Sequence, residues 1–293
     1  MNTHTPSLIR SLVVASLALA LGAGAQAQQT RNAEDPQIAR AKQQYDYGSW
    51  KQGPRRAGLD WRAVRFDGRV AEAYKLLPSD RLVRSYRSEA GASKVQLEVK
   101  VFDKAREAHE DLVESIAFVS STKSLPTTAA EGFAIGDRGY VGYSGAAPGA
   151  ISWIAWVDGN VSLRLCCHDP RKPLERPLSA MAEEVSALVR RGPELALEAP
   201  ARAPRIETLR ADRPRCKAGE EIALGVDVVD PLGTPCHQQW QIAGGALGYV
   251  EQDGDSWILS TTGPGTLELT LRVVGRYGVV ASKTLRLLVD EED

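Results

Sequence analysis

Alternation of apolar and polar residues is the clearest pattern in the first half of the chain. Residues 95–101 alternate with a period of two, which predicts a strand with one buried face. Residues 105–119 then carry apolar side chains three and four positions apart, which predicts a helix with one apolar face. Two further strand-like runs, 151–157 and 161–166, flank Asp158-Gly159-Asn160, a sequence suited to a tight hairpin turn.

A second helix is predicted over residues 178–191, where apolar side chains recur on one face and Gly192-Pro193 stops the pattern. The order of these elements indicates an α+β fold, an antiparallel sheet with the helices on one face. Residues 33–77 show weaker periodicity and are interpreted only as helix or coil at the start.

The last third of the chain has the pattern of an all-β fold. Residues 222–228, 266–273 and 280–289 each alternate or run apolar, and turn-forming Asp, Gly and Pro residues separate them. About seven short strands over about 87 residues have the number and spacing expected of an immunoglobulin-like sandwich.

Two stretches, "KAGEEIALGVDVVDPLGTPCHQQWQIAGG" and "GPGTLELTLRVVGRYGVVASKTLRLLV", resemble a bacterial Ig-like or PKD-type domain over residues 205–291. Ala218-Gly219-Glu220 before a strand and Trp240 on the third strand carry the resemblance. Ile242-Ala243-Gly244-Gly245 replaces the aspartate-rich glycine turn of PKD domains, so the subfamily stays open. The resemblance implies a spacer or contact module more than a site of chemistry.

The beginning of the chain has the pattern of a secretory signal. Arg10 precedes the apolar run 11–21, and Ala25-Gln26-Ala27 matches a cleavage site, which predicts a signal peptide over residues 1–27. The run is too short to span a bilayer comfortably, so we expect no stable membrane span after cleavage and a periplasmic or secreted protein.

The expected organisation after cleavage is two domains joined by a linker. We predict an α+β domain over residues 28–192, a Pro/Ala-rich linker over 193–204 and the Ig-like β-sandwich over 205–293. Residues 28–204 carry 26 Lys/Arg and 23 Asp/Glu, whereas 205–293 carry 9 and 14. The formal net charge of −1 gives no reason to expect a nucleic-acid partner.

Four cysteines in an exported chain favour disulfides over reduced thiols. Cys216 and Cys236 lie before two successive strands, and a bond between them is the pairing we expect. The alternative is that one of them bonds to the first domain, because four cysteines allow three connectivities.

The stretch "LRLCCHDP" raises a separate question. Cys166 and Cys167 would point to opposite faces of a strand, and Cys166 with His168 gives only two ligands, so no metal site is predicted. A vicinal disulfide and two buried free thiols remain as alternatives. The interpretation we favour is a strand end that turns at Asp169-Pro170, with the cysteines packing or bridging.

A basic and aromatic segment is the strongest candidate for binding. Residues 51–94 carry eleven Lys/Arg against five Asp/Glu, with aromatic residues between them. Either this is a solvated surface, docked on the acidic second domain, or it binds anions such as an acidic envelope polymer. The residues we assign to the binding face are Arg55, Arg56, Arg62, Arg65, Arg69 and Trp61.

No serine-hydrolase elbow, zinc-protease helix, P-loop or EF-hand pattern occurs, and Ser144 lacks the context of a nucleophile. We therefore expect no cofactor and a non-enzymatic binding or interaction protein of the bacterial cell envelope, with an envelope protein or acidic polymer as partner. The alternatives are an envelope polymer-acting hydrolase or its accessory subunit, and a thiol-redox protein that uses Cys166 and Cys167.

Overall fold

The computed structural model describes residues 34–122, 127–143, 150–169, 171–172, 174–196, 203–254 and 256–291. The predicted signal peptide, Ser144 and residues 197–202 of the predicted linker lie outside these ranges. The chain divides into two compact units, residues 1–48 and 49–293. No helix in the described ranges is both long and apolar enough to cross a bilayer.

The first unit contains α2 (Pro36–Gln44), and a 3₁₀ turn, η2 (Tyr47–Ser49), follows it. Asp35 caps the helix, because its carboxylate accepts a hydrogen bond from the backbone N–H of Gln37 at 2.8 Å.

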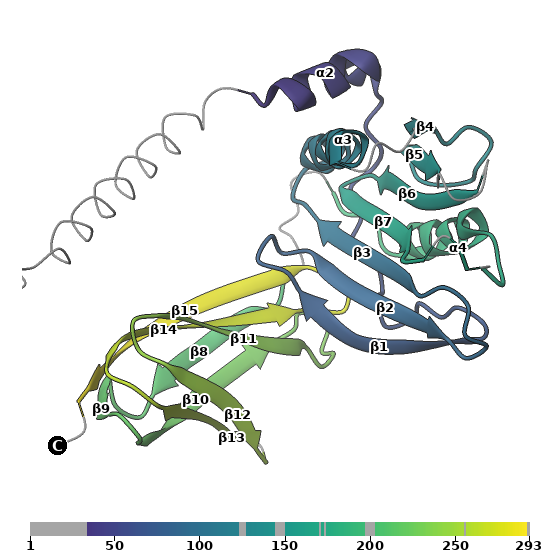
Figure 1. The fold of residues 1–293 in the computed structure, drawn as a ribbon. Coiled ribbons are helices and arrows are strands. Elements are labelled where there is room, and N and C mark those ends of the chain that lie inside the picture. Colours follow the sequence, from purple (N-terminus) through teal and green to yellow (C-terminus); the bar gives the residue numbers. More distant parts are fainter. Residues whose placement is uncertain are drawn as a thin grey trace, which may run out of the picture. The chain divides into compact units, whose positions relative to one another are not determined.

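Antiparallel sheets dominate the second unit. The larger sheet has seven strands in the order β1-β2-β3-β7-β6-β5-β4, with every neighbouring pair antiparallel (Figure 1). Its strands are β1 (Arg69–Leu76), β2 (Leu82–Ser88), β3 (Val95–Val101), β4 (Thr127–Ala129), β5 (Arg138–Tyr143), β6 (Ile151–Asp158) and β7 (Val161–Cys167).

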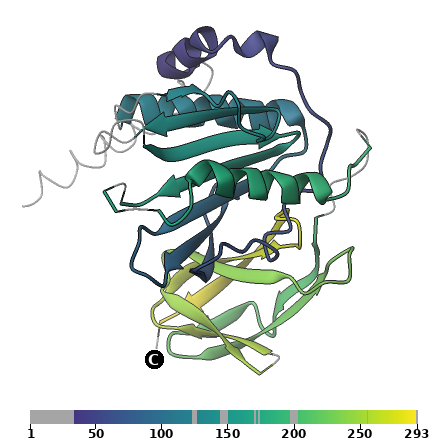
Figure 2. The ribbon, with the colours of Figure 1, turned by 90° about the vertical axis from the view of Figure 1, so that its right-hand side faces the viewer.

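Two helices, α3 (Ala105–Thr122) and α4 (Leu178–Arg191), pack on opposite faces of this sheet (Figure 2). On β7, Leu163 lies in one hydrophobic cluster with Met181 of α4, whereas the neighbouring Ser162 bonds to Asp111 of α3. The prediction that both helices cover one face is therefore wrong. An apolar stripe shows that a helix packs on something, but not which face of the sheet receives it.

The alternating pattern of residues 95–101 correctly predicted β3, and the hairpin at Asp158-Gly159-Asn160 is confirmed, with Gly159 at φ 59°. The helix predicted over residues 178–191 is α4. The interpretation of 33–77 as helix or coil missed β1, because the pairing register with β2 shifts between Ala71 and Tyr74 and breaks the period of two.

The strands after residue 204 form a pair of four-stranded sheets, which we call the C-terminal sheet pair (residues 205–291). Their orders are β12-β13-β10-β8 and β11-β14-β15-β9, and only β9 and β15 pair in parallel. The strands are β8 (Arg205–Ala211), β9 (Arg215–Lys217), β10 (Glu221–Val229), β11 (His237–Gly244), β12 (Gly248–Asp253), β13 (Ser256–Thr261), β14 (Gly265–Val274) and β15 (Val280–Asp290). Ile222 and Leu259 of one sheet share a hydrophobic cluster with Leu269 and Leu287 of the other.

Several contacts join the seven-stranded sheet to the C-terminal sheet pair. The indole Nε1 of Trp61 donates to the carbonyl oxygen of Gly275 at 2.8 Å. The side-chain amide of Gln239 both donates to and accepts from the backbone of Leu76, each at 3.0 Å, as a neighbouring strand would. Arg272, only 3% exposed, forms an ion pair with Asp80. Residues between 61 and 80 thus contact Gln239, Arg272 and Gly275 of the C-terminal sheet pair, and we call this region of contact the joint.

The beginning of the predicted linker also pairs with the rest of the unit. The backbone N–H of Leu195 donates to Arg55, and that of Ala57 donates to Pro193, both at 2.9 Å. These residues are therefore part of the folded unit.

Candidate functional site

Three of the six residues predicted to bind anions have buried side chains: Arg55, Trp61 and Arg69. Arg69 Nη2 lies 2.9 Å from Glu175, and Arg55 Nη2 lies 3.6 Å from Asp103. Both guanidinium groups thus neutralise carboxylates of the same chain.

The other three arginines also make internal contacts. Arg56 lies 3.3 Å from Asp158 and 2.7 Å from Glu194. Arg62 donates to a backbone carbonyl oxygen at 2.6 Å, and the exposed Arg65 donates to the carbonyl of the residue before it at 2.8 Å. Anion binding by this segment stays a prediction, and the contacts of Arg56 and Arg69 are structural.

None of the four cysteines forms a disulfide, so the predicted bond between Cys216 and Cys236 is wrong for this structure. Cys216 pairs with Val289 of β15. Cys236 directly precedes β11, whose first residue pairs with Val274, and Val274 pairs with Val280 at the other end of β15. Nine residues of strand separate the two ends, about 30 Å. A disulfide needs Cα atoms within about 7 Å.

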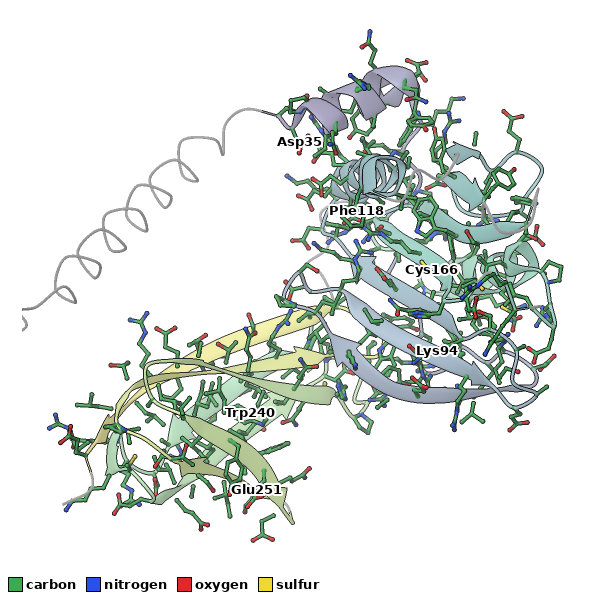
Figure 3. All side chains as sticks on the ribbon, viewed as in Figure 1. Asp35, Lys94, Phe118, Cys166, Trp240 and Glu251 are labelled. Atoms are coloured by element: carbon green, nitrogen blue, oxygen red, sulfur yellow. The ribbon has the colours of Figure 1, made fainter. Side chains whose placement is uncertain are left out.

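The "CCH" stretch is the end of β7 (Figure 3, where Cys166 is labelled). The Sγ of Cys167 lies 2.8 Å from Ser93 Oγ, and His168 Nε2 lies 2.9 Å from the Oε1 of Gln96. The vicinal disulfide is not formed, and β7 ends at Cys167 as the strand-end interpretation expects, whereas Pro170 of the predicted turn lies outside the described residues. Across the described residues, no three cysteine, histidine or acidic side chains are grouped as a metal ion would require.

The sequence patterns did not predict a buried cluster of charges where α3 crosses the sheet. Arg81 Nη2 donates to both oxygens of Asp111 at 2.6 and 2.7 Å, and Ser162 donates to the same carboxylate. Arg164 lies 3.6 Å from Glu98 and 3.7 Å from Asp111. Two acids and two arginines balance within the cluster, which identifies it as a structural ion-pair network.

Electrostatics agree with that assignment. Burial disfavours the ionised carboxyl of Asp111, but the Arg81 and Arg164 guanidinium groups outweigh it and hold its pKa below the usual value. Asp111 is therefore ionised throughout the neutral range.

A concave site lies in the C-terminal sheet pair, and we call it the recess. It has a volume of about 410 Å³ and opens between β10 and β13 of one sheet and the start of β11 of the other. Seven residues line it: Leu224, Val226, Cys236, His237, Gln238, Gln252 and Trp257. Most of the accessible surface of the recess comes from polar atoms, and Leu224, Val226 and Trp257 contribute the smaller apolar part.

The lining of the recess is uncharged at neutral pH. Burial, and then the positive charge of Arg62, lower the pKa of His237, so its ring is neutral. Burial, with a smaller contribution from Asp230, raises the pKa of Cys236 to about 11, so it is a thiol. The amide oxygen of Gln238 is buried and has no hydrogen-bond partner among the described residues.

Aromatic packing supports one wall of the recess. Trp257 pairs with Leu224 across the sheet, and its ring lies 5.6 Å from that of Trp240 in an edge-on arrangement. Figure 3 labels Trp240 within the C-terminal sheet pair.

In the sequence, Trp240 was interpreted only as an indication of the fold, and the recess was not predicted. The residues that line the recess come from different strands and lie as far apart in the chain as Leu224 and Trp257, which are 33 positions apart. The visible signal was the run "CHQQW" at 236–240, which is unusually rich in hydrogen-bonding side chains for a strand.

No protein-family model matches the chain, and no curated protein matches it.

Proposed function

We propose that this is an exported, non-enzymatic binding protein of the bacterial cell envelope, and that its ligand occupies the recess. The observation that carries the proposal is a recess of about 410 Å³ whose lining includes Trp257 and Gln238, and the buried amide oxygen of Gln238 has no hydrogen-bond partner among the described residues. Buried acceptors are almost always hydrogen-bonded, so an exception that lines a pocket favours binding of a donor. The neutral ring of His237 and the thiol of Cys236 offer further contacts for a ligand.

We also propose that residues 205–293 are an Ig-like sandwich. Such sandwiches divide their strands into A-B-E-D and C-F-G. When the strands are lettered in chain order, the A, B, E and D places of one sheet correspond to β8, β10, β13 and β12. The C, F and G places of the other sheet correspond to β11, β14 and β15. This strand order supports the proposal, together with Trp240 on the strand in the C place.

The remaining organisation follows the sequence pattern. Residues 1–27 would be removed on export, 28–192 would form the α+β domain, and 193–204 would connect it to the sandwich. The protein would then act in the periplasm or outside the cell, and its ligand would come from the envelope.

Alkylation of Cys236 tests the proposed site, because this thiol lines the recess. With a pKa of about 11, it should react slowly at pH 9, where about one thiol in a hundred is ionised, and faster as the pH rises. The exported protein would be alkylated at pH 9 with and without fractionated envelope extract, and each cysteine would be quantified by peptide mass analysis. We expect one fraction to slow the reaction of Cys236.

Cys166 supplies the internal control, because it is a half-buried thiol on the seven-stranded sheet. Its rate should not change with the fraction that protects Cys236. Protection of Cys166 instead, or no protection by any fraction, would contradict the proposed site.

A further inference from the structure

The recess presents one aromatic wall that is held in place before any ligand arrives. Trp257 is half-buried on β13, and Trp240 packs against it with ring centroids 5.6 Å apart and planes at 64°. An indole face kept in a fixed position suits a ligand with a flat apolar face of C–H groups.

The two glutamines of the lining, Gln238 and Gln252, are polar, in contrast to the aromatic wall. Gln238 lines the recess and keeps a buried amide oxygen without a partner among the described residues. A rotation of its amide would present that oxygen to a hydroxyl or N–H donor on a ligand. Gln252 comes from β12, and its amide nitrogen donates to the carbonyl oxygen of Gly254 at 3.0 Å, which orients the side chain. Amides of this kind both donate and accept, as neighbouring hydroxyl groups do.

The charge of the lining does not fit the acidic polymer that the sequence led us to expect as the ligand. None of the seven lining side chains is ionised at neutral pH. The two charges that act on His237 and Cys236, Arg62 and Asp230, are opposite in sign, so an anion in the recess would meet no net positive charge from them. The lining thus favours an uncharged ligand that is apolar on one side and rich in hydroxyl groups on the other.

We propose that the recess binds a neutral sugar ring of an oligosaccharide, with the ring stacked on Trp257 and a hydroxyl donating to Gln238. This inference rests on the proposed function and names the class of ligand for the same site.

Titration calorimetry of the exported protein with neutral tetrasaccharides tests it. The panel would hold tetramers of glucose in two linkages, of mannose and of N-acetylglucosamine, with tetragalacturonate as the charged comparator. At least one neutral tetramer should bind. Trp257→Ala should weaken that binding at least tenfold, and Gln238→Leu, which removes the acceptor at similar volume, should weaken it about fivefold.

Tyr249→Ala is the matched control, because Tyr249 is an aromatic residue on β12, 53% exposed and outside the lining. It should leave binding unchanged. If Trp257→Ala fails to fold, Trp257→Phe keeps an aromatic wall and should give an intermediate loss, while Gln238→Leu tests the polar contact separately.

The outcomes distinguish the two proposals. If no neutral tetramer binds but an envelope fraction still protects Cys236, the sugar assignment is overturned and the binding site stands. If tetragalacturonate binds more tightly than every neutral tetramer, the assignment of an uncharged ligand to the recess is overturned. If neither a sugar nor any fraction affects Cys236, both proposals fail.

Discussion

Replacing Arg81 with leucine is expected to lower the free energy of unfolding by about 3–5 kcal/mol. Arg81 is 4% exposed and donates to both oxygens of Asp111, which is itself largely buried. The substitution leaves that carboxylate with one hydrogen bond from the neutral Ser162 hydroxyl and only the longer ion-pair contact to Arg164, at 3.7 Å. Urea denaturation followed by circular dichroism measures the change.

Two further variants separate charge from shape. Arg106→Ala breaks an exposed ion pair with Glu110 on the same helix and should change stability by less than about 0.5 kcal/mol. The double variant Arg81→Leu with Asp111→Leu removes both partners and should recover part of the loss, because no charge is left unpaired. A loss below 1 kcal/mol for Arg81→Leu alone would contradict the assignment of a buried structural network.

Trp61→Ala is expected to lower the free energy of unfolding by about 3–5 kcal/mol, because it removes a 3% exposed indole from the core of the joint. The ring packs edge-on against Tyr74 with centroids 3.9 Å apart, and its Nε1 donates to Gly275 in the C-terminal sheet pair. The free energy of unfolding would be measured by urea denaturation, and the rate of tryptic cleavage after residue 191 would be the second readout.

Trp61→Phe is the control for the hydrogen bond alone. It should lower the free energy of unfolding by about 1 kcal/mol for the lost hydrogen bond, in addition to the small effect of the reduced side-chain volume. If Trp61→Ala left both stability and cleavage unchanged, the contact between Trp61 and Gly275 would not hold the joint.

Local patterns predicted individual elements well and their partners poorly. The polar residues of 95–101 were interpreted as one solvent-facing side of a strand, but Glu98 lies between Arg81 and Arg164. A period of two identifies two faces, and it cannot show that a charged cluster covers the polar one. For the same reason the sequence could not place α3 and α4 on opposite faces.

The density of arginines in residues 51–94 was a real feature whose meaning depended on the fold. The carboxylates that pair with Arg56 are Asp158 and Glu194, about 100 and 140 positions away in the chain. A spacing of 20 between Cys216 and Cys236 likewise suggested a disulfide, because it does not reveal that the strands carry them to opposite ends of β15.

The recess required the same kind of long-range information. Each lining residue is ordinary in its own strand, and only the pairing of β10 with β13 and the facing position of β11 bring Trp257 and Gln238 to one cavity. The sequence signal was confined to a strand unusually rich in amide side chains.

Nuclear magnetic resonance mapping of the ligand on the exported protein is the most direct test of the central claim that the recess is the binding site. The indole N–H of Trp257 and the side-chain amides of Gln238 and Gln252 each give their own ¹H–¹⁵N signal. On addition of the fraction or sugar that protects Cys236, we predict that these signals shift while the indole of Trp156, in the core of the seven-stranded sheet, stays unchanged. Shifts confined to β2, β3 and β7, with the recess signals unmoved, would contradict the account.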